Sequence, residues 1–272
     1  MITAVLLAAG YATRLYPLTQ DRPKALLPLG SGTILDAVCQ SLDTVPALAR
    51  RLLVTNRRFA GQFRAWQQTS QVALTVIDDG TESADTRLGA IRDLALAAAS
   101  AGPDDDVLVI GTDNLFRWPL GQFVAQAQRV RPAPSIALWN APSRDSATQF
   151  GVVIRDAKGW ITAFAEKSPQ PPSTEVSLCV YYFPAPMRGH IEVFLKSGGN
   201  ADAPGYFFTW LVEQGQPVYG VMMPGPWYDI GTRQAYEEVR QGWNRSQGFR
   251  IADFGLRMKE AACDGRCSPQ SR

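Results

Sequence analysis

In the stretch Ala4-Val5-Leu6-Leu7-Ala8-Ala9-Gly10, an apolar run long enough for a strand precedes a glycine. Further apolar runs of similar length follow in the first half of the chain: Leu52–Thr55, Leu74–Ile77, Val107–Ile110 and Ile136–Trp139. Between the runs lie segments whose apolar residues recur with helical spacing: Ile34–Leu42, Phe59–Gln67, Leu88–Ala99 and Leu120–Val130. Strands that alternate with helices predict an α/β fold with a doubly wound, mostly parallel mixed sheet and right-handed crossovers.

The second half of the chain has a different pattern. Two predicted strands, Gly151–Arg155 and Trp160–Glu166, flank a turn at residues 156–159, which indicates a small antiparallel addition to the sheet. Further strands are expected at Leu178–Phe183 and Pro217–Met223, and helices at Met187–Lys196, Tyr206–Gln214 and Thr232–Asn244. We predict a single domain over residues 1–245, divided into parts of about 1–140 and 141–245, with a C-terminal tail over 246–272.

The composition argues against several classes of protein. The net charge is +2, from 27 basic and 25 acidic residues, which is too balanced to indicate a nucleic-acid surface. No apolar stretch reaches the ~20 residues of a membrane-spanning helix, and the opening residues lack the basic start of a signal peptide. We therefore expect a cytoplasmic protein that binds neither nucleic acid nor membranes.

Cysteine and histidine are too sparse for the catalytic chemistries that depend on them. His190 is the only histidine, which argues against Ser-His-Asp, Cys-His and His-based zinc catalysis. Cys39 and Cys179 lie in apolar segments and are predicted to be buried. Cys263 and Cys267 lie in the polar tail, where no second pair and no nearby histidine supports a zinc site.

The loop after the first strand has the features of a phosphate-binding loop. In a doubly wound sheet ligands bind at the carboxyl ends of the strands, and small residues around Gly10 allow backbone N–H groups to approach phosphate oxygens. Arg14 and Lys24 add two cations to the same loop, as a triphosphate requires, although either could be a solvated loop charge. The glycine patterns of dinucleotide-binding folds and of P-loops are both absent.

An aspartate lies at the carboxyl end of another predicted strand, in VLVIGTDN at residues 107–114. A lone carboxylate at this position is a natural Mg²⁺ ligand when phosphates complete the coordination shell, which favours Asp113 as a metal ligand. The alternative is a cap for the helix that opens at Leu120, but a cap would lie nearer Trp118. The acidic run Asp104-Asp105-Asp106 precedes the strand, at its other end, and is predicted to form a solvated turn.

The segment LLAAGYATRLYPLTQDRPKALLPLG at residues 6–30 resembles the signature of the sugar-phosphate nucleotidylyltransferases, the family of glucose-1-phosphate thymidylyltransferase. In that family a Gly-rich loop with T-R-L-x-P-x-T is followed by a P-K pair. Ala12 replaces the usual glycine, and a slightly altered loop is expected because alanine adopts positive φ less freely. With Thr112, the residues implied to contact the nucleotide are Leu7, Ala8, Ala9, Gly10, Tyr11, Ala12, Thr13, Arg14 and Lys24.

Two more segments resemble parts of the nucleotide and metal sites of that family. WYDIGT at residues 227–232 is similar to W-x-D-I-G-T, which implies that Asp229 joins Asp113 as a Mg²⁺ ligand; the alternative is a cap of the following helix, a role that Thr232 can fill. The segments DDGT (78–81) and RLGA (87–90) match the base-recognition region, which implies nucleotide contacts from Asp79, Gly80 and Gly89.

The acceptor site is implied by further matches. AEKSP at residues 165–169 resembles E-K-P, whose lysine grips the sugar phosphate, and Lys167 holds that position. The other residues predicted to bind the acceptor are Asn114, Gly151, Glu166, Cys179 and Tyr206. Cys179 stands where the family has a glycine that faces the sugar hydroxyls. The resemblance therefore does not identify the sugar, and phosphocholine or a phosphonate stays an alternative acceptor.

The resemblance extends from about Ile2 to Asn244 and implies a Rossmann-like nucleotidyltransferase fold. It implies a Mg²⁺-dependent enzyme that condenses a nucleoside triphosphate with a sugar 1-phosphate and releases pyrophosphate, with Arg14, Lys24, Asp113 and Lys167 as catalytic residues. The first part of the domain would bind the nucleotide and the second part the sugar phosphate. The alternatives are a cytidylyltransferase for a non-sugar phosphate or phosphonate, a non-catalytic sugar-nucleotide-binding protein, and a glycosyltransferase, against which the missing D-x-D argues. The sequence does not determine which nucleotide base is used or whether the protein forms a homo-oligomer.

Overall fold

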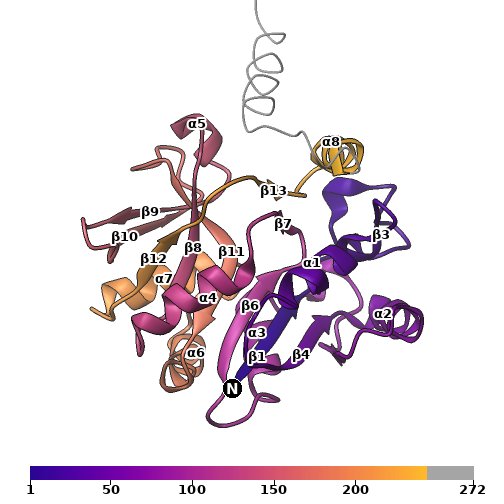
Figure 1. Cartoon of the computed structure of the whole chain (residues 1–272), viewed down its shortest axis with the longest axis horizontal. Coiled ribbons are helices and arrows are strands. Elements are labelled where there is room, and N and C mark those ends of the chain that lie inside the picture. The colour runs from indigo at the N-terminus through magenta and orange to yellow at the C-terminus, as the bar shows by residue number, and fades with distance from the viewer. Residues whose placement is uncertain (244–272) are drawn as a thin grey trace, which may run out of the picture.

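A computed structural model of the protein describes residues 1–243. In this part of the chain nine strands form the central sheet: β1 (Ile2–Leu7), β4 (Leu48–Thr55), β5 (Thr75–Asp78), β6 (Asp106–Gly111), β8 (Ser135–Asn140), β9 (Gly151–Arg155), β10 (Ile161–Glu166), β11 (Glu175–Phe183) and β12 (Tyr219–Met222). The strand order is β10-β9-β11-β6-β1-β4-β5, and β8 pairs with both β11 and β12 (Figure 1).

The sheet changes character at the boundary between β6 and β11. On one side β6, β1, β4 and β5 are all parallel, as the alternation of strands and helices predicts. On the other side β11 runs antiparallel to β6, β8 and β9, and the predicted hairpin of β9 and β10 forms. The predicted α/β fold with a mixed sheet is therefore confirmed, and the carboxyl ends of the parallel strands form one edge on which a site can be built.

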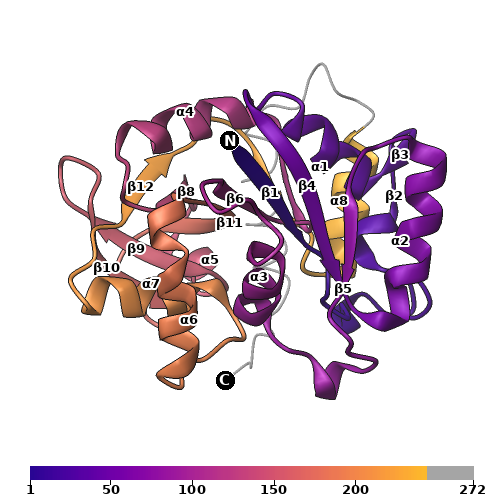
Figure 2. The same ribbon diagram turned by 90° about the horizontal axis from the view of Figure 1, so that it is seen from below.

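Helices cover both faces of the sheet (Figure 2). Their bounds are α1 (Ile34–Leu42), α2 (Arg57–Ser70), α3 (Ala90–Ala98), α4 (Leu120–Arg129), α5 (Arg144–Ala147), α6 (Gly189–Lys196), α7 (Pro204–Glu213) and α8 (Arg233–Trp243). Buried residues of α1, α2, α4 and α8 belong to one hydrophobic cluster, and those of α3, α6 and α7 belong to the other. Each of these seven helices thus buries one apolar face, as the spacing of its apolar residues indicates.

Side-chain caps set where the helices next to the first loop begin. At α1, Asp36 N donates to Thr33 Oγ1 at 3.2 Å and Thr33 N donates to Asp36 Oδ2 at 2.7 Å, which is a capping box. At α2, Phe59 N donates to Asn56 Oδ1 at 3.1 Å. Asn56 follows β4 directly, so the cap fixes the turn that leads from the sheet edge into α2.

Two small sheets lie outside the central one. β7 (Asn114–Phe116) pairs antiparallel with β13 (Trp227–Asp229), and β2 (Pro28–Leu29) pairs antiparallel with β3 (Gly32–Thr33). None of these strands was predicted, because two or three residues carry no recognisable periodicity. The β7–β13 pair matters most for function, since it places Asp229 opposite Asn114.

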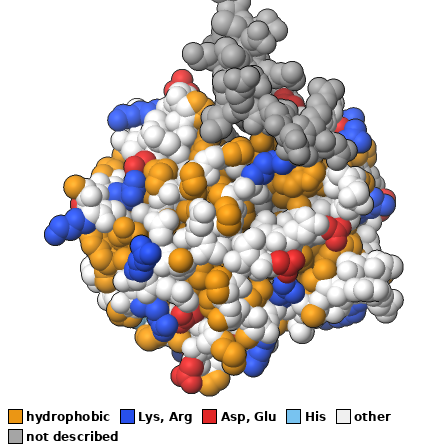
Figure 3. Space-filling view, viewed as in Figure 1, with side chains coloured by type: hydrophobic (Ala, Val, Ile, Leu, Met, Phe, Trp, Pro, Cys, Tyr) orange, Lys and Arg blue, Asp and Glu red, His pale blue; other side chains and the backbone are white. Residues whose placement is uncertain are grey.

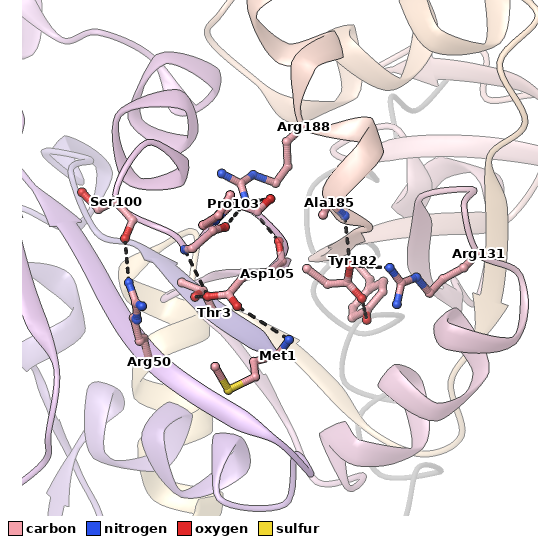
Figure 4. Close-up of polar contacts among 12 residues, drawn as sticks. Met1, Thr3, Arg50, Ser100, Pro103, Asp105, Arg131, Tyr182, Ala185 and Arg188 are labelled. Carbon is pink, nitrogen blue, oxygen red and sulfur yellow. Dashed lines mark hydrogen bonds and ion pairs between the residues drawn. The ribbon is translucent and has the colours of Figure 1, made fainter.

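The predicted solvated turn at residues 104–106 is wrong for two of its three aspartates. Asp104 is exposed, but Asp105 is 5% exposed and Asp106 is 3% exposed. Thr3 Oγ1 donates to Asp105 Oδ2 at 2.8 Å, and the N-terminal ammonium group of Met1 lies 3.6 Å from Asp105 Oδ1 (Figure 4). Asp105 therefore ties the start of β1 to the start of β6.

Asp106 has equally specific partners. The Tyr182 hydroxyl donates to one of its carboxylate oxygens, and Ala185 N donates to the other at 2.9 Å. Arg131 Nη2 forms an ion pair with the carboxylate at 3.1 Å (Figure 4). These partners are 25 to 79 positions away in the chain, so a run of three acidic letters could not reveal them. The cluster lies at the amino end of β6, away from the edge that carries the candidate site.

The remaining broad predictions have mixed outcomes. Cys39 is buried, as predicted, whereas Cys179 is half-buried. Within residues 1–243 no helix is both long enough and apolar enough to cross a membrane. On the face drawn in Figure 3, basic and acidic side chains are interspersed. The predicted tail with Cys263 and Cys267 lies outside the described residues, and the division of the domain at about residue 140 stays a prediction.

Candidate active site

Two carbonyl groups of the loop after β1 accept hydrogen bonds from side chains at the end of β4. Thr55 Oγ1 donates to Ala8 O at 3.3 Å, and Asn56 Nδ2 donates to Ala9 O at 2.9 Å. In the described part of the chain, the amide N–H groups of Ala9, Gly10 and Tyr11 have no hydrogen-bond acceptor. A row of free N–H groups is suited to phosphate oxygens.

Ala12 adopts the left-handed conformation that the glycine of the resembled signature would take freely. Its φ is 48° and its ψ is 42°. Thr19 Oγ1 donates to Ala12 O at 2.7 Å and Leu15 N donates to the same oxygen at 3.0 Å, which holds this conformation in place. The loop keeps a tight turn at the cost of strain in one alanine. The turn exposes Thr13 and Arg14, and Arg14 has no ion-pair partner within residues 1–243.

Asp113 and Lys24 form the centre of the site. Lys24 Nζ donates to Asp113 Oδ2 at 2.8 Å and to Ile230 O at 3.0 Å. Burial raises the pKa of the Asp113 carboxyl, but the Lys24 ammonium and the hydrogen bonds that Asp113 accepts outweigh this effect and lower the pKa. Asp113 is therefore a carboxylate at neutral pH, positioned by a lysine from the loop after β1.

Asn114 orients Asp113 from the other side. Asn114 Nδ2 donates to Asp113 Oδ1 at 2.8 Å, while Asn114 Oδ1 accepts from Trp227 Nε1 at 2.8 Å and from Cys179 N at 3.3 Å. The side chain is buried and its hydrogen bonds are used within the protein. Trp227 and Ile230 were not predicted as site residues, although the W-x-D-I match contains both. Contact of Asn114 with an acceptor stays a prediction.

Asp229 enters the site through β13. Burial and the charge of Asp113 raise the pKa of Asp229 to about 6, whereas Lys24, Arg14 and Lys167 act in the opposite direction. The fold thus brings two carboxylates and three cations from four separate segments within electrostatic range of one another. These are the residues that the sequence motifs single out. Their proximity in space could not be deduced from their separations in the sequence.

The pair of carboxylates suits a magnesium ion. Both side chains offer hard oxygen ligands, and their mutual repulsion is expressed in the raised pKa of Asp229, which a divalent cation would relieve. Among residues 1–243 no group of three or more His, Cys, Asp or Glu side chains gathers. Two protein carboxylates with the remaining positions left to phosphates and water are typical of Mg²⁺ and not of a zinc site.

Lys167 and Glu166 lie at the end of β10. Lys167 has a positive φ of 47°, and its backbone N–H donates to Phe150 O at 3.1 Å. Lys167 Nζ lies 3.9 Å from Glu166 Oε1, and the lysine side chain is 62% exposed. Glu166 is nearly buried, and burial raises the pKa of its carboxyl while Lys167 lowers it. The lysine can therefore reach a phosphate without breaking a strong ion pair.

Glycines leave room for the Glu166 side chain on two sides. A Cβ atom added to Gly151 would lie 2.9 Å from Glu166 Oε2, and one added to Gly205 would lie 1.8 Å from it. Tyr206 follows Gly205 at the start of α7 and is 38% exposed. The predicted acceptor residues Gly151, Glu166 and Tyr206 are therefore gathered at one place, and their contact with a substrate stays a prediction.

Cys179 packs beside the Asp113 carboxylate. A Cβ atom on Gly111 would lie 2.7 Å from Cys179 Sγ and 2.9 Å from Asp113 Oδ1, so the thiol fills space directly beside that carboxylate. Burial, with Asp113 as the next cause, raises the pKa of the Cys179 thiol to about 12. The thiol is therefore uncharged at neutral pH.

The predicted base-recognition residues lie next to the loop after β1. Tyr11 OH and Thr81 Oγ1 are 3.2 Å apart, and Asp79 Oδ1 accepts from Thr81 N at 2.7 Å and from Thr81 Oγ1 at 2.8 Å. Gly80 N donates to Asp78 Oδ1 at 2.8 Å in a tight turn. Thr112, which was predicted to contact the nucleotide, is buried and donates through Oγ1 to Leu7 O at 2.9 Å.

The start of α3 is bonded to the segment that precedes α7. Gly89 has a φ of 92°, and a Cβ atom there would lie 2.6 Å from Ala201 O, so only glycine suits the position. Ile91 N donates to Ala201 O at 3.0 Å, and Arg87 Nε forms an ion pair with Asp202 at 3.0 Å. The predicted base side and acceptor side of the site are thereby joined.

An α/β sheet that carries unpaired backbone N–H groups, two carboxylates and three cations at its carboxyl edge is suited to binding phosphate groups. The sequence profile of the family described as nucleotidyl transferase matches residues 3–245. The chain belongs to the nucleotidyl transferase family. The resemblance seen in the sequence motifs is thus confirmed, as is the fold class.

Relatives within this family are named for different bases. The chain is 26% identical to UTP–glucose-1-phosphate uridylyltransferase of Synechocystis sp. and 30% identical to glucose-1-phosphate adenylyltransferase of Corynebacterium diphtheriae. In both comparisons 88% of this chain is covered, and the chain spans 62% of the length of the relative. Both names are those of nucleotidyltransferases, in agreement with the predicted enzyme class, while the base differs between them.

A solved structure supports the fold independently. The Bacillus anthracis protein described as a glucose-1-phosphate thymidylyltransferase, in complex with a sucrose, superposes with a TM-score of 0.76 at 20% identity. The superposition covers 92% of this chain and 98% of that chain. At this identity the likeness shows a shared fold alone.

Proposed function

We propose that the protein is a Mg²⁺-dependent nucleotidylyltransferase that joins a nucleoside triphosphate to a sugar 1-phosphate and releases pyrophosphate. The observation that carries the proposal is the meeting of Asp113 and Asp229 with Arg14, Lys24 and Lys167 at one sheet edge. Binding a neutral ligand would need none of these charges. The names of the relatives, which share a sugar 1-phosphate as substrate, support the same acceptor class.

The residues of the chain divide into a triphosphate side and an acceptor side. The free N–H groups of residues 9–11 and the exposed Arg14 would bind the triphosphate, and Lys24 would contact its phosphates from the same loop. Asp113 and Asp229 would hold Mg²⁺, which would neutralise charge on the reacting phosphates when bound. Lys167 would hold the acceptor phosphate against its repulsion from the triphosphate.

The transfer itself requires no protein nucleophile. An oxygen of the acceptor phosphate attacks the α-phosphorus in line, the bond from the α-phosphorus to the bridging oxygen breaks, and pyrophosphate leaves with that electron pair. Positioning and charge stabilisation drive such a reaction. Arg14 would stabilise the negative charge on the leaving pyrophosphate.

We propose the cytoplasm as the compartment, because nucleoside triphosphates are available there. Whether the protein forms a homo-oligomer stays open.

The proposal is tested by measuring pyrophosphate release over a matrix of nucleoside triphosphates and acceptors, with and without Mg²⁺. The acceptors include several sugar 1-phosphates, phosphocholine and a phosphonate, because Cys179 narrows the space beside Asp113. We expect release that requires one triphosphate, one sugar 1-phosphate and the metal. Release with only phosphocholine or the phosphonate would show that the acceptor is not a sugar 1-phosphate. Release with none of the acceptors would overturn the proposed activity.

A further inference from the structure

The indole N–H group of Trp227 is bonded to the side chain that holds Asp113. Trp227 Nε1 donates to Asn114 Oδ1 at 2.8 Å, and Asn114 Nδ2 donates to Asp113 Oδ1 at 2.8 Å. Asn114 is 3% exposed and Trp227 is 8% exposed, so little water can take the place of either partner. Losing one partner of a buried hydrogen bond leaves the other unsatisfied, which is costly. Trp227 is therefore connected to the Asp113 carboxylate through a single amide group.

The indole decides which end of the Asn114 amide faces Asp113. An amide side chain has an acceptor end and a donor end, and rotation about its last bond exchanges them. Two N–H groups claim the oxygen end, Trp227 Nε1 at 2.8 Å and Cys179 N at 3.3 Å, so the NH₂ end is left for Asp113. The reverse orientation would place the Asn114 oxygen against the carboxylate and the NH₂ group against two donors. Of the two bonds that prevent this reversal, the one from Trp227 is the shorter.

Trp227 lies on the same strand as the second proposed metal ligand. In the β7–β13 pair (Figure 1), Asp229 lies directly opposite Asn114, and Trp227 precedes Asp229 by two residues. Alternate residues of a strand project to one side, and so do residues that face each other in a pair of strands. Trp227, Asp229 and Asn114 therefore share one side of this ribbon. The indole bond runs diagonally across it and holds β13 in register with the residue beside Asp113.

Aromatic packing fixes the position of the indole itself. The ring centroids of Trp227 and Phe150 are 5.0 Å apart in an edge-on arrangement, and those of Trp227 and Trp139 are 5.6 Å apart. Aromatic rings at these distances attract one another. A phenylalanine at position 227 would keep an aromatic ring in this cluster and lose the N–H group. The hydrogen bond to Asn114 can therefore be removed while most of the packing is retained.

We propose that Trp227 is a positioning residue of the metal site: its indole N–H fixes the Asn114 amide, and the amide fixes the Asp113 carboxylate, which sets the affinity for Mg²⁺. Residues that orient a metal ligand without touching the metal typically change metal affinity by about 10- to 100-fold when they are altered. No covalent bond changes in this role. The inference rests on the proposed function, because it concerns the metal ligands of that site.

Trp118 provides a matched control. It is 5% exposed, lies just after β7 and stacks on Phe116 with the ring centroids 4.0 Å apart. Its Nε1 atom is buried and has no hydrogen-bond partner within residues 1–243. Trp118→Phe therefore makes the same chemical change at a buried position as Trp227→Phe, without breaking a hydrogen bond. The difference between the two variants isolates the bond from Trp227 to Asn114.

The test measures binding of Mn²⁺ alone to the complete chain, from the EPR signal of the free ion, with Mn²⁺ as a substitute for Mg²⁺. We expect Trp227→Phe to weaken Mn²⁺ binding about tenfold or more, and Trp118→Phe to change it by less than about twofold. Trp227→Phe should also need more Mg²⁺ for half-maximal pyrophosphate release and recover most of kcat at saturating Mg²⁺, which a distorted fold would not do. Circular dichroism checks that each variant is folded.

A double variant tests whether Trp227 acts through Asn114. Asn114→Leu breaks the same connection at its centre, so it should weaken Mn²⁺ binding by at least as much as Trp227→Phe. Trp227→Phe added to Asn114→Leu should then weaken binding no further, because residues of one hydrogen-bonded chain are not additive. If Trp227→Phe does not fold, Asn114→Leu takes its place beside Trp118→Phe, and normal Mn²⁺ binding in Asn114→Leu would contradict the proposal.

Each remaining outcome bears on one proposal or the other. Unchanged Mn²⁺ binding in Trp227→Phe, an equal loss in Trp118→Phe, or additive losses in the double variant would overturn the positioning role and leave the transferase proposal standing. Mn²⁺ binding that depends on Trp227, in a protein that releases no pyrophosphate, would support the positioning role and contradict the proposed reaction. Absence of Mn²⁺ binding by the unaltered protein would overturn the positioning role together with the proposed metal dependence.

Discussion

Lys24 Nζ lies 2.8 Å from Asp113 Oδ2, so an ammonium group from the loop after β1 holds the carboxylate at the end of β6. The two residues are 89 positions apart, and the same ammonium group donates to Ile230 O beside Asp229. One lysine therefore links the loop after β1 to Asp113 and to the residue that follows Asp229. This relationship joins the two halves of the proposed mechanism and leads to the first prediction.

Replacing Lys24 by methionine removes the proposed phosphate contact and also the ammonium group that holds Asp113. We expect kcat/KM for the triphosphate to fall by at least about 100-fold, since a charge-stabilising contact of the transition state is lost. Steady-state kinetics of pyrophosphate release measure the effect. Lys158→Met, in the exposed turn between β9 and β10, is the control and should retain full activity. A Lys24→Met enzyme with normal kcat/KM would remove Lys24 from the mechanism.

Lys167 should act on the acceptor and not on the nucleotide. In Lys167→Met we expect KM for the acceptor to rise about tenfold or more, with KM for the triphosphate nearly unchanged, because only the acceptor phosphate loses its cation. Lys196→Met, on the exposed face of α6, controls for loss of a surface charge. An equal rise in both KM values would mean that Lys167 serves the site as a whole.

Asp93 should make the protein less stable at high pH. Burial of this carboxyl in α3 raises its pKa from 3.8 to about 7 on folding, so between these values the folded state binds a proton that the unfolded state has lost, and stability falls as pH increases. At roughly 1.4 kcal/mol per pKa unit the cost above pH 7 is on the order of 4 kcal/mol.

Asparagine at position 93 cannot ionise, so Asp93→Asn should unfold at a higher temperature than the unaltered protein at pH 8, with the difference shrinking toward pH 4. Thermal unfolding monitored by circular dichroism across this range measures it. Asp85→Asn, at an exposed position before α3, should follow the unaltered protein at every pH. Parallel curves for Asp93→Asn and the unaltered protein would show that Asp93 keeps an ordinary pKa.

Asp106 should support the fold without taking part in the reaction. Asp106→Ala leaves the Tyr182 hydroxyl, Ala185 N and Arg131 without their acceptor, and we expect a loss of about 3 kcal/mol or more in the free energy of unfolding. Asp104→Ala, at the exposed position two residues earlier, should change it by less than about 0.5 kcal/mol. Denaturant unfolding gives both values. Unequal kcat/KM for the two folded variants would contradict a purely structural role.

Much of the fold could be predicted from local pattern. The bounds of α1 and β9 agree with those expected from apolar spacing, because each segment has one buried face that the period reveals. β7 and β13 were missed, since three residues make no period, and it is tertiary pairing that makes them strands. The antiparallel placement of β11 beside β6 likewise depends on contacts that no local pattern encodes.

The candidate site was accessible to sequence reasoning only through motifs. Asp113 and Asp229 were paired because each matches a signature, whereas the β7–β13 ladder that brings them together was not foreseen. Asp93 was overlooked because a single acidic residue in a helical pattern is normally solvated. Asp105 and Asp106 were misjudged for the same reason: burial of a charge depends on partners such as Thr3 and Arg131, which lie far away in the sequence.

The most direct measurement of the central claim follows the two ends of the triphosphate separately, with label on the α-phosphorus in one reaction and on the γ-phosphorus in another. With Mg²⁺ and a sugar 1-phosphate, the α label should appear in the sugar nucleotide and the γ label in pyrophosphate. Asp113→Asn should fold yet form neither product, while Asp104→Asn should form both. Transfer of the γ label to the acceptor, or full activity in Asp113→Asn, would contradict nucleotidyl transfer at this site.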